Sequence, residues 1–146
     1  MRATGVSITT TVTPAGEPRG LTASAVASVS LDPPLVLVCV EHTADTYAAL
    51  RESRRFAINF LSSEMESVSR RFADGDAADK FRDVPHHRGS TGVPILQGAL
   101  AWVECRVHAL HEGGDHAIFV GEVVDAGVGG GEPLLYYRGR YGRLAQ

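Results

Sequence analysis

The 146-residue chain has 44% hydrophobic and 21% charged residues, a composition ordinary for a soluble globular protein. Its formal net charge of −3 gives no electrostatic reason to expect nucleic acid or an anionic membrane as a partner. No apolar segment approaches the roughly 20 residues that cross a bilayer, and no secretory signal is recognisable at the N-terminus. We therefore expect a single domain over residues 1–146, located in the cytoplasm.

The first half of the chain predicts strands separated by turns. Residues 5–13 (GVSITTTVT) are mostly β-branched and predict a strand, and residues 14–18 (PAGEP) predict the turn of a hairpin. Residues 35–40 are apolar without alternation, as in a strand covered on both faces. Residues 56–61 alternate and predict a further strand. Both cysteines lie in strand-like apolar runs, which is typical of packed, reduced thiols in a cytoplasmic protein rather than of a disulfide.

Two short helices are predicted between these strands. Thr43 is placed to cap a helix over residues 44–54. Residues 63–66 (SEME) have the pattern of a capping box. The helix that this box would open has an apolar stripe of Met65, Val68 and Phe72.

The second half of the chain begins with a polar excursion over residues 74–92 and then returns to strands. Residues 99–110 alternate, with Ala101, Val103 and Cys105 on one face and Trp102 and Glu104 on the other. A turn at residues 113–114 leads into a hairpin partner over 117–124. Residues 127–131 form a loose tip, and residues 133–137 and 141–144 are expected to close the sheet.

The fold class follows from how these elements are connected. Most strands are joined by turns and the helices are few, which favours a mainly β structure, an antiparallel barrel with helices at its rim. The sequence contains no Rossmann glycine fingerprint and no P-loop, so a nicotinamide nucleotide would not bind in the usual dinucleotide fold.

Residues 19–34 (RGLTASAVASVSLDPP) are the most informative stretch of the chain. Small and hydroxylated residues let a ligand approach the backbone closely and add hydrogen-bonding groups, which suits a planar ligand with polar edges. The alternative interpretation is a small-residue strand that packs against a helix.

Five segments, in order, resemble the flavin reductase family, the NAD(P)H-dependent reductases that supply reduced flavin to two-component monooxygenases. These segments are GLTASAVASVSLDPPLVLVCV from residue 20, FAINFL from 56, DKF from 79, GGDHAIFVGEV from 113 and PLLYYRGRYGRL from 133. The resemblance implies a Greek-key FMN-binding split barrel that forms a homodimer with flavin near the subunit interface. It also implies a helix before the first strand, for which residues 1–4 leave no room, so the chain is either short or truncated.

The resemblance also implies which residues contact the flavin. The ring and ribityl contacts fall, largely through backbone N–H groups, on Leu21, Thr22, Ala23, Ser24, Ala25 and Ser28. Donors near flavin N1 and O2 would favour the reduced state, because negative charge develops there.

A second group of residues is suited to phosphate. The start of the helix after residue 43 offers unsatisfied N–H groups and a favourable dipole, so His42, Thr43, Ala44 and Thr46 are candidates for the flavin phosphate. Asp45 would be a poor neighbour for a phosphate, and an ordinary capped helix is the alternative. Lys80 is a candidate for the phosphate or NADH, or else it is a solvated surface lysine.

His116, in GDH, is the candidate catalytic residue, because its imidazole can hold the amide or pyrophosphate of NAD(P)H. A histidine that stabilises its own turn is the alternative. Arg138 and Tyr141 are candidates for the pyrophosphate and for flanking a ring, unless the tyrosine belongs to the core of a last strand. We expect no metal site, since neighbouring histidines such as His86 and His87 tend to point apart and no ligand set has suitable spacing.

Together these features predict an NAD(P)H:flavin oxidoreductase that reduces FMN or FAD with NADH or NADPH and passes reduced flavin to a partner monooxygenase. Two other functions remain open: a non-catalytic flavin carrier or sensor, and a split-barrel oxidoreductase with a different substrate.

Overall fold

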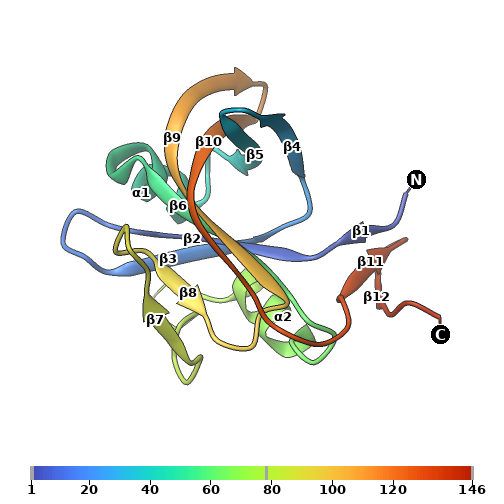
Figure 1. Ribbon diagram of the computed structural model, residues 1–146. Helices are drawn as coiled ribbons and strands as arrows, with labels where there is room; N and C mark the ends of the chain where they lie inside the picture. Colours follow the sequence, from blue (N-terminus) through green and yellow to red (C-terminus); the bar gives the residue numbers. More distant parts are fainter. Residues whose placement is uncertain (1, 78, 146) are drawn as a thin grey trace.

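The computed structural model describes residues 2–77 and 79–145. The main sheet consists of β2 (Ser7–Val12), β3 (Pro18–Ala23), β4 (Val26–Leu31), β5 (Pro34–Glu41), β6 (Arg55–Phe60), β9 (Ala101–Gly113) and β10 (His116–Val128). Its seven strands lie in the order β3-β2-β6-β9-β10-β5-β4, and all neighbours are antiparallel. The sheet curls strongly (Figure 1), and its edge strands β3 and β4 are joined by Ser24 and Ala25 alone. This is a split antiparallel barrel with its opening at the β3–β4 junction, so the predicted mainly β fold is confirmed.

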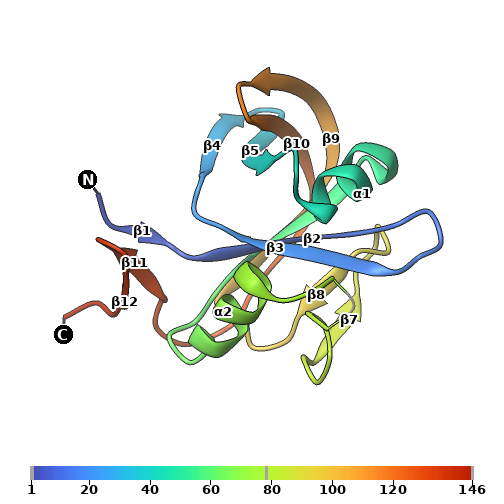
Figure 2. The same ribbon diagram turned by 180° about the vertical axis from the view of Figure 1, so that it is seen from behind.

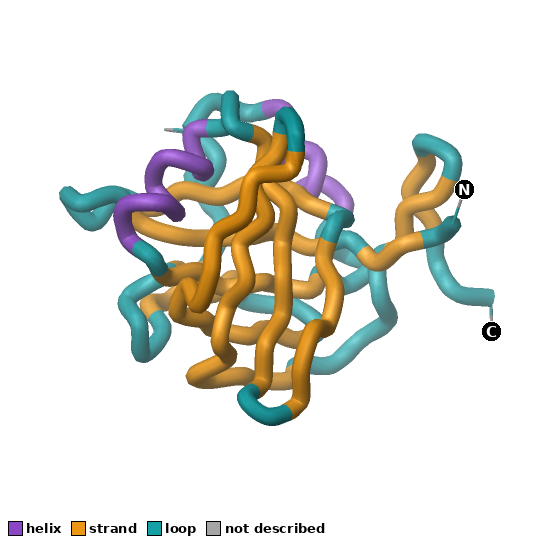
Figure 3. The backbone as a smooth tube through the Cα atoms, turned by 90° about the horizontal axis from the view of Figure 1, so that it is seen from above, coloured by secondary structure: helices purple, strands orange, loops and turns teal. Residues whose placement is uncertain are grey.

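A second, three-stranded sheet is formed by β1 (Thr4–Gly5), β11 (Leu135–Tyr137) and β12 (Arg140–Gly142), and we call it the terminal sheet. It projects from the barrel in two perpendicular views (Figures 1 and 3). Residues 133–137 and 141–144 were expected to close the main sheet, and that expectation is wrong. The predicted strand over 5–13 is split at Val6 because β1 pairs with β11 while β2 pairs with β3 and β6.

The hairpin β9–β10 is longer than predicted, since β9 extends to Gly113 and β10 covers residues 116–128. Part of the expected loose tip at 127–131 is therefore strand. The polar excursion over 74–92 also contains regular structure, because β7 (His86–Arg88) pairs with β8 (Pro94–Leu96).

The two helices are α1 (Asp45–Ser53) and α2 (Glu66–Asp74), and both pack against β2 and β3 (Figure 2). Both predicted caps are wrong. The N-cap residue of α1 is Ala44, one residue after Thr43, and no side chain caps this end. The capping box fails because α2 begins only at Glu66, whose carboxylate pairs with Arg70. Ser63 lies before the helix, where its backbone N–H donates a hydrogen bond to the carbonyl of Glu132.

Three apolar clusters form the core, the smallest of them around Ala57, Val93 and Ile95. The first lies inside the barrel around Val38, Phe56 and Phe119. The second, around Ile8, Phe72 and Leu96, lies between the barrel and α2. Among the described residues, neither helix is long and apolar enough to cross a membrane.

Candidate flavin site

A cavity of about 200 Å³ lies where β3, α2 and the terminal sheet meet. Its lining brings together residues far apart in the sequence: Val6, Thr22, Ala23, Ser24, Ala73, Tyr136 and Tyr141. Four of the predicted cofactor-binding residues, Thr22, Ala23, Ser24 and Tyr141, are thus neighbours at the opening of the barrel. A second cavity of about 280 Å³ shares Ser24 and is lined also by Thr4, Val26 and Phe60.

The other three residues predicted to contact the flavin ring, Leu21, Ala25 and Ser28, lie outside both cavities. Leu21 is half-buried and packs against the barrel core. The carbonyl of Ala25 accepts a hydrogen bond from the N–H of Cys39, and Ser28 is exposed on β4 opposite Val36. Because β3 and β4 are edge strands, alternate N–H and C=O groups along them face away from the sheet and are free for a ligand.

Lys80 is half-buried rather than a fully solvated surface lysine, and its predicted role toward the phosphate or NADH stays a prediction. Its ammonium donates a hydrogen bond to the carbonyl of Gly20, 2.9 Å away, just before the small-residue stretch. Burial lowers the pKa of Lys80, and the charge of Asp45 acts in the opposite direction. The lysine thus ties the loop after α2 to the edge of β3, close to the start of α1.

The start of α1 retains features of an anion site. Since no side chain caps it, its first N–H groups are not engaged by a neighbouring hydroxyl. Thr43 is exposed there, whereas Thr46 is buried. Asp45 lies in the first turn and faces the region of Lys80, so a phosphate here would have one acidic neighbour.

His42 and His116 are brought together at the end of β5 and β10. The N–H of His42 bonds the carbonyl of Asp115, whose carboxylate lies 2.7 Å from Nδ1 of His116. Nε2 of His42 lies 2.6 Å from Oε2 of Glu112, across the hairpin. The side chain of His116 is 37% exposed, so its ring can meet a ligand while Asp115 fixes its orientation.

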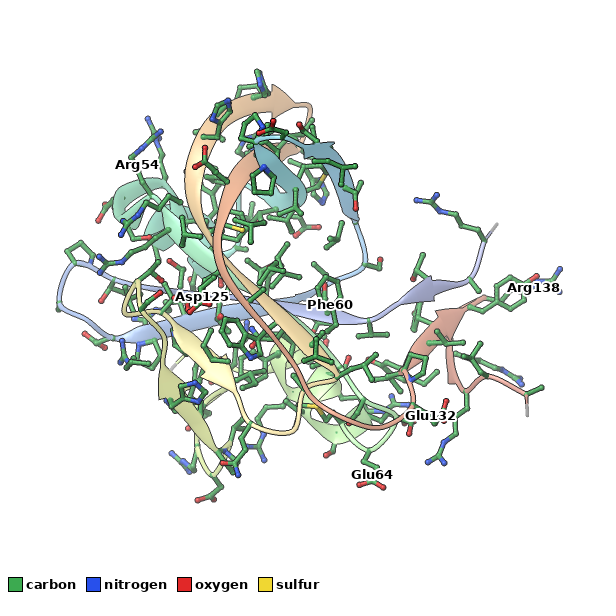
Figure 4. The ribbon with its side chains drawn as sticks, viewed as in Figure 1. Arg54, Phe60, Glu64, Asp125, Glu132 and Arg138 are labelled. Carbon is green, nitrogen blue, oxygen red and sulfur yellow. The ribbon has the colours of Figure 1, made fainter. Side chains whose placement is uncertain are left out.

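Arg138 lies apart from all of these residues. Figure 4 shows it at the outer end of the terminal sheet, and its guanidinium lies 5.2 Å from the ring centre of Tyr137. Within one chain it therefore joins neither Tyr141 at the cavity nor His116.

The paired histidines of the excursion are engaged differently. Nδ1 of His86 bonds the carbonyl of Val84 at 2.8 Å, while His87 is exposed. Within residues 2–77 and 79–145, no group of three His, Cys, Asp or Glu side chains is placed to hold a metal ion.

Two buried residues of this region were not foreseen. Glu104 was placed on the strand face opposite Cys105, and it is fully buried and accepts hydrogen bonds from Ser90 and Thr91. Ser69, on α2, contacts both Thr22 and Tyr141. No local sequence pattern marks either residue, because their partners are distant in the chain.

Residues 1–145 match the family model described as flavin reductase like domain, and the chain belongs to that family.

The similar proteins are named as reductases or as reductase components of monooxygenases. The chain is 49% identical over 142 residues to the reductase component of a 4-nitrophenol 4-monooxygenase/4-nitrocatechol 2-monooxygenase from Rhodococcus opacus, covering 97% of this chain and 75% of that protein. It is 42% identical over 143 residues to an NADH-dependent FMN reductase from Agrobacterium fabrum, covering 98% and 80%. Among solved structures, an NADH:FAD oxidoreductase from Streptomyces globisporus in complex with NAD and FAD fragments superposes with a TM-score of 0.92, at 42% identity, covering 99% of this chain and 87% of that one.

Proposed function

We propose that this chain is an NAD(P)H:flavin oxidoreductase that reduces FMN or FAD and supplies the reduced flavin to a partner monooxygenase. The observation that carries the proposal is the cavity at the barrel opening, where Thr22, Ala23 and Ser24 meet Tyr141. The relatives support it, since two of those described above are named as NADH-dependent reductases of FMN or FAD.

The residues present fit a flavin. The cavity offers small side chains and aromatic walls to a planar ring, and the edges of β3 and β4 offer backbone donors and acceptors to its polar rim. The uncapped start of α1, with the exposed Thr43, is suited to the flavin phosphate. A bound flavin and nicotinamide together supply the chemistry, a hydride transfer from nicotinamide C4 to flavin N5.

The chain's own contribution is to hold and orient the two nucleotides. No general base is needed, because a hydride carries its own electron pair. His116 is the residue we assign to the nicotinamide nucleotide. With Nδ1 engaged by Asp115, Nε2 of His116 is left to meet an amide or a pyrophosphate oxygen.

We also propose a homodimer in which the terminal sheet meets the second copy. The sheet projects from the barrel and exposes Tyr136 and Tyr137, 39% and 42% accessible, which is typical of an interface. A dimer would offer a place for Arg138, which does not reach the cavity of its own chain. The family model spans nearly the whole chain, which supports one domain, and the free thiols of Cys39 and Cys105 suit the cytoplasm.

The experiment is to follow NADH consumption in air by purified protein with excess FMN, then with FAD and with NADPH. A reductase consumes NADH only when flavin is present. The assays with FAD in place of FMN and with NADPH in place of NADH establish which flavin and which nicotinamide nucleotide are used. Flavin binding without NADH consumption would contradict the proposal and favour a carrier or sensor. Light scattering of the same sample tests the dimer.

A further inference from the structure

Ser69 connects two walls of the cavity at the barrel opening. It lies on α2 and is fully buried. Its carbonyl accepts a hydrogen bond from the hydroxyl of Thr22 at 2.7 Å, and its own hydroxyl lies 2.7 Å from that of Tyr141. One buried residue therefore holds a side chain of β3 and a side chain of the terminal sheet.

These bonds decide the chemistry of the cavity. Thr22 and Tyr141 contribute two of its hydroxyls, and both are engaged by Ser69 rather than directed at a ligand. The rest of the lining is largely hydrocarbon: Val6, Ala23, Ala73 and the ring of Tyr136. Two hydroxyls remain: that of Ser24, which is exposed at the rim, and that of Tyr136, which lies beside Gly139 at the turn of the terminal sheet. The cavity therefore presents an apolar interior to whatever enters it.

The position of the Tyr141 ring is fixed from several sides. The guanidinium of Arg70, one residue after Ser69, lies 4.8 Å from the centre of the ring. Tyr136 meets the same ring edge-on, with 5.3 Å between centroids. The hydroxyl contact with Ser69 adds the directional constraint, because ring contacts alone leave rotation about the ring axis cheap.

The volume suits one end of a flavin. An apolar cavity of about 150 Å³ is known to accept benzene, so about 200 Å³ accommodates a benzene ring with methyl groups. The isoalloxazine has one such end, the dimethylbenzene edge, whereas its opposite edge carries carbonyl and N–H groups that would lose their hydrogen bonds here.

We propose that this cavity takes the dimethylbenzene edge of the flavin and that Ser69 is the positioning residue that keeps it apolar and correctly shaped. The inference rests on the proposed function, since it presupposes that a flavin binds. It assigns the polar edge of the ring to the backbone groups of β3 and β4.

The test measures flavin affinity by fluorescence quenching, with FMN and with its analogue lacking the 7- and 8-methyl groups. Burying two methyl-sized groups favours FMN over the analogue by roughly tenfold in the wild type. Ser69→Ala leaves the Tyr141 hydroxyl without its partner and should weaken FMN binding about fivefold while reducing that discrimination.

The double variant with Ser69→Ala and Tyr141→Phe makes the test specific, because removing both hydroxyls restores an apolar wall. It should regain most of the FMN affinity and most of the methyl discrimination. Ser67→Ala, at an exposed position of the same helix, is the matched control and should behave as the wild type. Ala73→Leu fills the cavity and should weaken FMN at least tenfold, and the analogue less.

The outcomes separate this inference from the proposed function. Equal affinity of the wild type for FMN and the analogue would overturn the placement of the dimethylbenzene edge. Unchanged affinity and discrimination in Ser69→Ala would overturn the role of Ser69, and melting curves verify that each variant is folded. If Ser69→Ala does not fold, an unchanged Ala73→Leu overturns the cavity assignment instead. A wild type that binds neither flavin refutes the proposed function itself.

Discussion

The ammonium of Lys80 donates a hydrogen bond to the backbone carbonyl of Gly20, 2.9 Å away, at the outer edge of β3. An edge strand leaves such carbonyls without a strand partner, and here a lysine from another segment satisfies one of them. The contact holds the strand in place immediately before Leu21–Ala25, the stretch assigned to the flavin. Partial burial disfavours the charged form of the ammonium and so lowers the pKa of Lys80.

Replacing Lys80 by methionine tests this positioning role. The variant keeps most of the apolar stem but leaves the Gly20 carbonyl unpaired, so unfolding should require about 1–2 kcal/mol less free energy. FMN affinity should fall in parallel, because β3 loses an anchor beside the cavity. Urea denaturation and fluorescence quenching measure the two effects. Arg106→Met removes an exposed cation of β9 and is the control; an equal loss in both variants would show that charge alone matters.

Glu104 is a second buried group whose partners lie in a distant loop. Its Oε2 accepts bonds from the N–H and hydroxyl of Thr91, at 2.8 and 2.5 Å, and its Oε1 accepts the N–H of Ser90 at 3.2 Å. A side chain at Gly89 would overlap the carboxylate, so the loop closes tightly around it. The carboxylate thereby anchors the β7–β8 hairpin to β9.

Glu104→Gln should lower the free energy of unfolding by about 2–4 kcal/mol, because an amide N–H₂ would face the donors of Ser90 and Thr91. Glu64→Gln changes an exposed carboxylate and should stay within about 0.5 kcal/mol of the wild type. Chemical denaturation of both variants provides the comparison. Stability of Glu104→Gln equal to that of the control would mean that the carboxylate does not anchor the loop.

The sequence predicted the strands better than it predicted the contacts between them. Alternation and β-branching are local properties, so β5 and β6 were recognised near their true limits, and β9 and β10 were recognised as strands although both extend further than predicted. The terminal sheet was missed because its pairing joins β1 to β11, at opposite ends of the chain. No pattern within either segment reports such a partner.

The predictions of the helix caps failed, and the burial of Glu104 was missed. Thr43 and Ser63 have suitable residue types, but Ala44 takes the first position and Ser63 bonds Glu132 instead. The alternation of residues 99–110 placed Glu104 opposite Cys105 but could not show that the Ser90–Thr91 turn folds over it. Contacts with distant segments account for the outcome at Ser63 and Glu104, whereas nothing in the structure explains why Thr43 does not cap α1.

The two cysteines should differ strongly in reactivity. Burial, with a further contribution from the charge of Glu104, raises the pKa of Cys105 to about 12. At pH 8 that thiol holds almost no thiolate and should resist iodoacetamide, whereas the half-buried Cys39 should react first. Mass spectrometry of alkylated peptides measures both sites, and urea should expose both. Alkylation of native Cys105 as fast as Cys39 would contradict the packing of β9.

The contact between Asp115 and His116 should be visible in a titration. The hydrogen bond from His116, together with the charge of its ring, holds the pKa of Asp115 below its usual value. The stabilisation is therefore present above the ordinary carboxyl range, about 3.9, and is lost as the pH falls through the lowered pKa. In His116→Ala the carboxyl resonance of Asp115, followed by NMR, should titrate at a higher pH. His87→Ala, in β7, should leave that titration where it is in the wild type.

The most direct test of the claim that this chain reduces flavin is to measure flavin reduction by NADH without oxygen. The protein is mixed with FMN and a matching amount of NADH in the absence of oxygen, and the visible flavin absorbance is followed. We expect that absorbance to bleach at least tenfold faster with wild-type protein than without protein. Bleaching no faster than in the protein-free control, although FMN is bound, would contradict the assignment of this chain as a flavin reductase.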